Sequence, residues 1–341
     1  QQFFASLYAA LPIYFIVMIV ILSIASLIFS GALASQLSYA IGFAVAGAIL
    51  LLLTPTLFSS YSGAITVTQD TPAVIVALAV SSVVAQFPAH SAPEMIFPTV
   101  IALTIGATIA MGAIYLLLGF LGLGGLTRFL PYPVLGGFLA GTGALLVMGG
   151  FSVATNIPMS IDMIQPGIMV KWIPAGFVGL ATLLAQRRFR SPFALVATFV
   201  LSTLTFHAVT LPLGISQHRA LAAEWLLGPF PDQISWHMPF DMDMISLINW
   251  PILLNAIPII APAFLISTVA LLLNASGLEL IVKRDISLNR ELIIAGIGNI
   301  ASGLAGGLIG YPAISLSALY HSLRPGKRLP GLLVCVMLLI T

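Results

Sequence analysis

The 341-residue sequence has few charged residues. Aspartate, glutamate, lysine and arginine make up 6% of it, whereas hydrophobic residues make up 60%. Soluble domains carry roughly 25% charged residues, so this chain cannot cover a water-facing surface. The net charge is only +2 and no basic arm is present, which argues against a nucleic-acid-binding protein. We therefore expect an all-α polytopic membrane protein with lipid as its surroundings.

Cysteine and catalytic motifs are also scarce. The single cysteine, Cys335, excludes a disulfide framework and a thiol metal site. No His-Glu-x-x-His or Gly-x-Ser-x-Gly motif and no cluster of metal ligands occurs in the sequence, so we expect neither an enzyme nor a cofactor or bound metal. The first residues lack a basic segment typical of a cleavable signal. The chain ends on "LLVCVMLLIT", which we interpret as an incomplete membrane span.

Apolar runs long enough to cross a membrane, about 20 residues each, recur along the chain. The uncharged stretch 11–58 is long enough for two spans, with a hinge near 31–36. Further spans are predicted at 97–123, 131–151, 167–186, 191–213, 251–273 and 292–308, with a last one starting near Leu329. The segments around Asp70 and after Gly306 are apolar but shorter than a full span.

The distribution of lysine and arginine predicts the orientation, because these residues collect on the cytoplasmic side. If both short segments cross the membrane and the N-terminus is inside, ten of the twelve basic residues lie inside and six of the ten acids outside. We therefore expect a multi-pass protein of the bacterial inner (plasma) membrane with a cytoplasmic N-terminus. The basic residues are Arg128, Arg187, Arg188, Arg190, Lys283, Arg284, Arg290, Arg324, Lys327 and Arg328, and the acids are Glu94, Asp162, Glu224, Asp232, Asp241 and Asp243.

The two short segments resemble each other. They read "ITVTQDTPAVIVALAV" (65–80) and "GGLIGYPAISLSALY" (306–320), and their prolines, Pro72 and Pro312, are 240 residues apart (312 − 72). The first spans of the two halves begin near Leu11 and Pro251, also 240 apart (251 − 11). Seven spans per half would make the repeats inverted, because seven is odd. We predict a first repeat at 1–213, an external linker at 214–249 and the start of a truncated second repeat at 250–341.

Interrupted spans at matching positions point to a transporter binding site at the middle of the membrane. Residues 65–69 alternate apolar and polar, which favours a short strand, and such a strand must be paired inside the protein, most simply with 307–310. Pro72 suits the first turn of a helix, with Asp70 or Thr71 as its N-cap. Two half-helices starting at Pro72 and Pro312 would each bring about half a positive charge to the site.

Two motifs resemble those of the SulP family of anion transporters, which are relatives of sulfate permeases. "SLNRELIIAGIGNIASGLAGG" (287–307) resembles the family's N-x-E-L-x-x-x-G-x-x-N…G-G signature, and "LPYPVLGGFLAGTG" (130–143) resembles its P-x-P-V-x-x-G-F-x-x-G motif. The resemblance implies a fold of seven plus seven inverted spans, a core domain that moves against a gate domain, a homodimer and a C-terminal cytoplasmic domain. If the resemblance holds, we expect the last three spans and that domain to lie beyond the sequence considered.

Departures from the family pattern concern charge. Leu316 stands where the family has an arginine, the glutamate of the eighth span is absent with Asn274 the nearest polar residue, and Asp70 stands where relatives are neutral. This pattern resembles a divergent bacterial and fungal branch, some of whose members are linked to storage of basic amino acids. For Glu279 and Glu291, salt bridges to nearby lysine or arginine are the expected role.

Asp70 has three open interpretations. It caps a half-helix, or it carries a proton because desolvation favours a neutral carboxyl, or it balances a cationic substrate. Intramembrane acids cost at least ~2.5 kcal/mol by insertion scales, which favours a role beyond capping. The hypothesis is a secondary active transporter of a small anion (sulfate, bicarbonate or carboxylate), a symporter that is coupled to protons or to another ion through Asp70. A proton-coupled transporter of a basic amino acid and a channel are the alternatives. The expected binding residues are Asp70, Gln69, Thr68, Thr71, Ala73, Tyr311, Ala313, Ser315 and Ser317.

Overall fold

The computed structural model describes residues 2–29, 31–88, 91–125, 132–155, 157, 160–189, 193–223, 225–226, 239, 242–323 and 328–341. These residues form two compact units, one of residues 1–142 with 234–341 and one of residues 143–233. The larger unit takes helices from both predicted repeats, so the units cut across the repeat boundary. Much of the predicted linker 214–249, and Arg128, Arg190, Arg324 and Lys327, lie outside the described residues.

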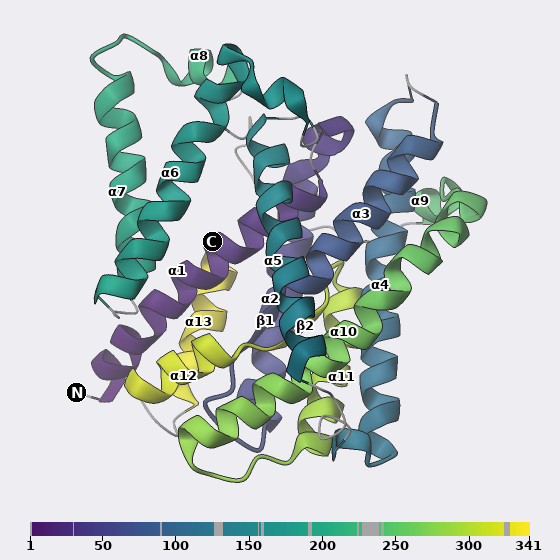
Figure 1. The fold of residues 1–341 in the computed structure, drawn as a ribbon. Helices are drawn as coiled ribbons and strands as arrows, with labels where there is room; N and C mark the ends of the chain where they lie inside the picture. The colour runs from purple at the N-terminus through teal and green to yellow at the C-terminus, as the bar shows by residue number, and fades with distance from the viewer. Residues whose placement is uncertain are drawn as a thin grey trace. The chain divides into compact units, whose positions relative to one another are not determined.

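The larger unit is built from apolar helices around a short strand pair (Figure 1). The uninterrupted helices of its first part are α1 (Gln2–Ile28), α2 (Leu37–Phe58) after the short 3-10 helix η1 (Gly31–Gln36), and α4 (Pro93–Phe120). Those of its second part are α10 (Trp250–Val282), α11 (Leu288–Leu304) and α13 (Leu329–Ile340), preceded by the short α9 (Met242–Ser246). Helices cover the spans predicted for this unit, and η1 lies at the predicted hinge 31–36. Among the described residues, five helices are long and apolar enough to cross a membrane.

The two short segments are interrupted as predicted. β1 (Thr66–Thr68) precedes α3 (Asp70–Gln86), and β2 (Gly310–Pro312) precedes α12 (Ile314–Leu323). The strands pair antiparallel, with Val67 opposite Tyr311. Because the strands run in opposite directions, α3 and α12 begin at opposite ends of the pair and extend away from it on different sides (Figure 1).

Two boundaries differ from the prediction. The partner of β1 is 310–312 and not 307–310, and Pro312 ends β2 and does not begin α12. Proline fits the strand because this small ladder has an outer edge where a backbone N–H is not needed. Pro72 does lie in the first turn of α3, as predicted, but the helix begins at Asp70, so Gln69 is the N-cap residue.

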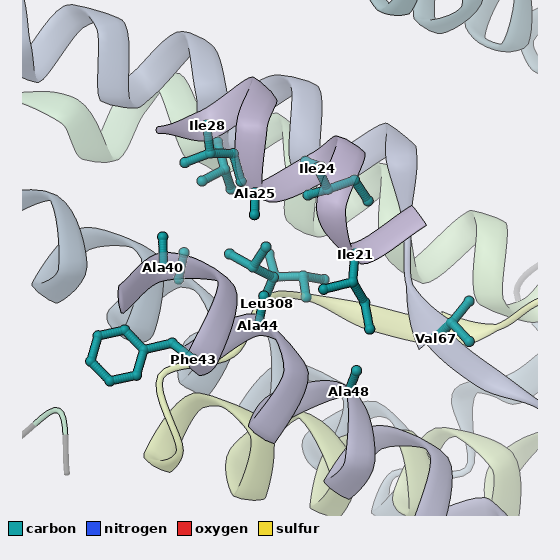
Figure 2. Packing of buried hydrophobic residues seen from close by; sticks show 14 of the residues in the cluster. Ile21, Ile24, Ala25, Ile28, Ala40, Phe43, Ala44, Ala48, Val67 and Leu308 are labelled. Carbon is teal, nitrogen blue, oxygen red and sulfur yellow. The ribbon is translucent and has the colours of Figure 1, made fainter. Parts of the chain in front are cut away.

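Small residues let the segment before β2 approach the helices closely. A Cβ atom at Gly47 of α2 would collide with the backbone of Gly307, and Gly306 has a φ of +86° that favours glycine. Leu308 then places its side chain between α1 and α2, among Ile21 and Ala44 (Figure 2). The core of the larger unit therefore fixes the start of β2 by packing.

The smaller unit contains the end of α5 (Tyr132–Thr155), the 3-10 helix η3 (Ile161–Ile164), α6 (Pro166–Phe189), α7 (Phe193–Thr210) and the short α8 (Gln217–Ala222). Helices α6 and α7 pack against each other. The Trp172 ring stacks edge-on against Phe151, and its indole N–H donates to the carbonyl of Met163 at 2.9 Å. These contacts join η3, α5 and α6 into one unit.

Candidate functional site

Asp70 opens α3 with an exposed side chain. Its Oδ1 accepts from the backbone N–H of Thr71 at 2.8 Å, and the Thr71 hydroxyl lies 3.3 Å from the same oxygen. Thr71 and Ala73 are buried on the other side of this first turn. Asp70 is the first residue of the helix and not its N-cap, so the carboxylate holds only the Thr71 N–H, while its outer face stays accessible for a further role.

Thr68, Gln69 and Tyr311 connect the start of α3 with β2. The Gln69 side chain is half-buried, and its Nε2 donates to the Tyr311 carbonyl at 2.8 Å. The buried Tyr311 phenol lies beside the Thr71 side chain and within electrostatic range of Asp70. Thr68 is 2% exposed, and its hydroxyl has no hydrogen-bond partner among the described residues. An unpaired hydroxyl in a dry interior is costly, which sets Thr68 apart from the paired groups around it.

The start of α12 presents Ser315 to the surface and turns its neighbours inward. Ser315 is exposed, whereas Ala313, Leu316 and Ser317 are buried. The Ser317 hydroxyl accepts from the backbone N–H of Ile65 at 2.9 Å, so it supports the residue that leads into β1. Leu316 packs in the main hydrophobic core, and the family arginine position is therefore an apolar core position in this chain.

The two half-helices differ in how many backbone donors remain at their N-termini. In α3, the Asp70 N–H alone has no acceptor among the described residues, because Thr71 donates to Asp70, Pro72 has no N–H, and the Ala73 N–H donates to the Gln69 carbonyl at 3.3 Å. In α12, the N–H groups of residues 314–316 have no acceptor in the part of the chain that the structure describes. Free N–H groups at a helix N-terminus attract anions. The α12 end thus carries the anion-attracting donors, and the α3 end carries the acid.

Two polar residues of the 287–307 motif hold neighbouring segments in place by hydrogen bonds. Asn289 Oδ1 accepts from the Gly124 N–H at 2.7 Å, which ties α11 to the end of α4. Glu291 is 2% exposed and accepts from the hydroxyls of Ser59 and Ser60 and from the Ser60 N–H, at 2.7 to 3.0 Å. The motif therefore anchors the loop that leads into β1.

The salt-bridge expectation for two of the acids is wrong within the described residues. Glu291 bonds the serines of the loop after α2, and Glu279 Oε1 accepts from the Ile286 N–H at 3.0 Å. Arg290 instead donates to the carbonyl of Phe58 at the C-terminus of α2, at 2.8 and 3.1 Å. A cation at a helix C-terminus is favourable, and so is an acid near the N-terminus of α11. Loop hydrogen bonds between segments 230 residues apart leave little signal in a sequence.

Two interrupted helices joined by a strand pair, among helices long and apolar enough to cross a membrane, are typical of the inverted-repeat fold of membrane transporters. The chain belongs to the sulfate permease family, which it matches over residues 3–341. The resemblance drawn from the two motifs is confirmed, and so is the predicted fold class.

Comparisons with individual proteins agree with this assignment. The chain is 26% identical over 309 residues to the bicarbonate transporter BicA of Picosynechococcus sp., covering 84% of this chain and 48% of that protein. It is 23% identical over 263 residues to the vacuolar basic amino acid transporter VSB1 of Saccharomyces cerevisiae, covering 72% of this chain and 25% of that protein. The transmembrane domain of a cyanobacterial BicA has a similar structure, with a TM-score of 0.72, 19% identity and coverage of 100% of this chain and 82% of that one. The chain thus spans about half or less of these two curated relatives.

Proposed function

We propose that this chain forms the membrane part of a secondary active transporter that moves a small anion such as sulfate, bicarbonate or a carboxylate. The observation that carries the proposal is the unequal pair of half-helix ends. The start of α12 offers unpaired N–H groups to an anion, while Asp70, at the start of α3, offers an accessible acid. The relationship to BicA supports an anionic substrate.

Asp70 is the proposed coupling residue. A carboxylate close to a bound anion repels it, and at 4 Å one unit of charge matters by about 4 kcal/mol at an effective dielectric near 20. Protonation of Asp70 removes this repulsion, so uptake of a proton and of an anion would favour each other. We propose direct contacts for the exposed or half-buried residues Asp70, Gln69 and Ser315. The buried members of the proposed site (Thr68, Thr71, Ala73, Tyr311, Ala313 and Ser317) shape its wall.

A basic amino acid is the second candidate substrate. Asp70 is accessible as a counter-charge, and Leu316 provides no arginine to bind an anion. The relationship to VSB1 supports this candidate. The ammonium group of such a solute would bind the charged carboxylate of Asp70.

We also propose that the full protein is a homodimer in the plasma membrane with its N-terminus in the cytoplasm. The dimer rests on the family resemblance. The orientation rests on the lysine and arginine distribution, in which Arg187 and Arg188 close α6, and Lys283 and Arg284 follow α10.

Uptake by the full transporter in proteoliposomes tests the substrate. Sulfate, bicarbonate, arginine and lysine are offered as competitors at pH 6 and pH 8. We expect inhibition by at least one of the anions. Inhibition by arginine and lysine alone would favour the second candidate. Flux that does not saturate and shows no counter-flow would indicate a channel of the same fold and contradict the proposal.

A further inference from the structure

The outer edge of β2 is satisfied by side chains in place of a third strand. Ala313 donates its N–H to the carbonyl of Ile65 in the lead-in to β1, at 2.8 Å. Successive residues of an antiparallel strand direct their backbone groups toward the partner and away from it in turn. Gly310 and Pro312 therefore direct their backbone groups away from β1. An unsatisfied polar group at membrane depth costs several kcal/mol, so this edge needs partners.

Two asparagines from different helices supply these partners. Asn299 of α11 donates Nδ2 to the Gly310 carbonyl at 2.7 Å and accepts the Gly310 N–H at 2.9 Å. Asn274 of α10 donates Nδ2 to the Pro312 carbonyl at 2.9 Å. Pro312 has no N–H to satisfy. With Gln69 on the Tyr311 carbonyl, three side-chain amides hold the three successive carbonyls of β2.

We propose that Asn274 is a positioning residue for the transport site. It holds the peptide group that lies two residues before α12, and α12 then presents Ser315 and the unpaired N–H groups to the site. A carbonyl clamped at this point fixes the direction in which α12 leaves the strand. β1 lacks such a clamp: among the described residues no side-chain amide bonds its backbone. The inference rests on the proposed function only in assigning the site to the α12 end.

The accessibility of an introduced cysteine at Ser315 tests the clamp without a transported substrate. The full transporter carries S315C in a background without Cys335 and any other cysteine, and the rate of its reaction with a membrane-impermeant maleimide is measured in proteoliposomes. N274L keeps the shape of the side chain but removes the donor, and N274D replaces the donor by an acceptor. We expect the labelling rate to change at least threefold in both. N255L, which alters an exposed asparagine of the same helix, is the matched control and should leave the rate unchanged.

A second reporter separates positioning from loss of fold. Ser216, the exposed N-cap of α8, is changed to cysteine in the same backgrounds, and its labelling should not respond to the Asn274 variants. If the labelling rates of both S315C and S216C change, the variant has lost its fold, and N274Q is then used to test the clamp. This variant keeps an amide donor, so S315C labelling should return toward the wild-type rate. Equal S315C labelling in N274L, N274D and N255L, or labelling in N274Q as altered as in N274L, would overturn the proposal. Because no uptake is measured, these results stand whatever the substrate proves to be.

Discussion

The two half-helices occupy matching places in the inverted repeats, yet they differ in length, charge and support. α3 has 17 residues and begins with an acid, whereas α12 has 10 residues and no acid. At the start of α3, the Asp70 carboxylate accepts the N–H of the next residue, Thr71. The start of α12 is held from outside, through Asn274 on the preceding strand. The pair thus combines an end that carries a charge with an end whose first three N–H groups have no acceptor among the described residues.

This difference teaches how a symmetric fold can make an asymmetric site. Two bare helix N-termini would both favour anions. Placing Asp70 at one of them consumes a donor and adds a negative charge, so the two ends attract groups of opposite sign. The variant with the largest expected effect removes the negative charge of Asp70.

D70N should lower uptake at least tenfold and flatten its pH dependence, because the asparagine still accepts a hydrogen bond at the helix end but cannot carry a proton. The melting temperature of the purified protein should stay close to that of the wild type. Uptake and its pH profile are measured in proteoliposomes, with D162N at the exposed Asp162 as the matched control. Wild-type uptake and pH dependence in D70N would remove Asp70 from the mechanism.

L316R puts the family arginine back into α12 and should deplete folded protein. Leu316 is buried in the core, and an unpaired buried charge costs several kcal/mol. S315R places the same side chain at the exposed neighbouring position and should fold. The amount of monodisperse protein on size-exclusion chromatography compares the two, and equal recovery would show that the two positions are not distinguished by burial.

G47A should destabilise the lead-in to β2 by about 1–3 kcal/mol, the usual cost of overpacking, because its methyl group would meet the Gly307 backbone. G106A is the matched control, since a Cβ there meets nothing within 4 Å. Thermal unfolding in detergent measures both. An unchanged melting temperature in G47A would mean that the close packing before β2 is not needed.

S317A should cost about 1–3 kcal/mol, because it leaves the buried N–H of Ile65 without its acceptor. S315A, on the exposed side of the same helix, should change stability by less than about 0.5 kcal/mol. The melting temperatures of the two variants give the comparison. A result in which S315A is the more destabilising would reverse the assignment of the two serines to the site and to the support.

The sequence was most informative where a pattern is local. Hydropathy gave the full-length helices, and the 240-residue offset between Pro72 and Pro312 located both interruptions. The pairing register of β1 with β2 was harder to predict, because Pro312 fits either the first turn of a helix or the end of an edge strand. The structure places it in the strand, where its missing N–H leaves no orphan group.

The hydrogen-bond partners of buried polar groups could not be predicted from the sequence. Glu291 was expected to meet nearby cations, but serines 231 and 232 residues away bind it. Nothing in the sequence indicated that the side-chain amides of Asn274 and Asn299 both donate to carbonyls of β2.

The sequence by itself determined that the chain lies in a membrane, that it belongs to an inverted-repeat class, and that two crossings are broken, because apolar length and proline spacing are properties of the chain. Only the tertiary structure decided that the first three N–H groups of α12 stay without an acceptor among the described residues while the Thr71 N–H of α3 bonds Asp70, and which distant amides hold β2. The physical reason is that a hydrogen bond depends on where two groups meet in space, and segments far apart in the chain bring them together.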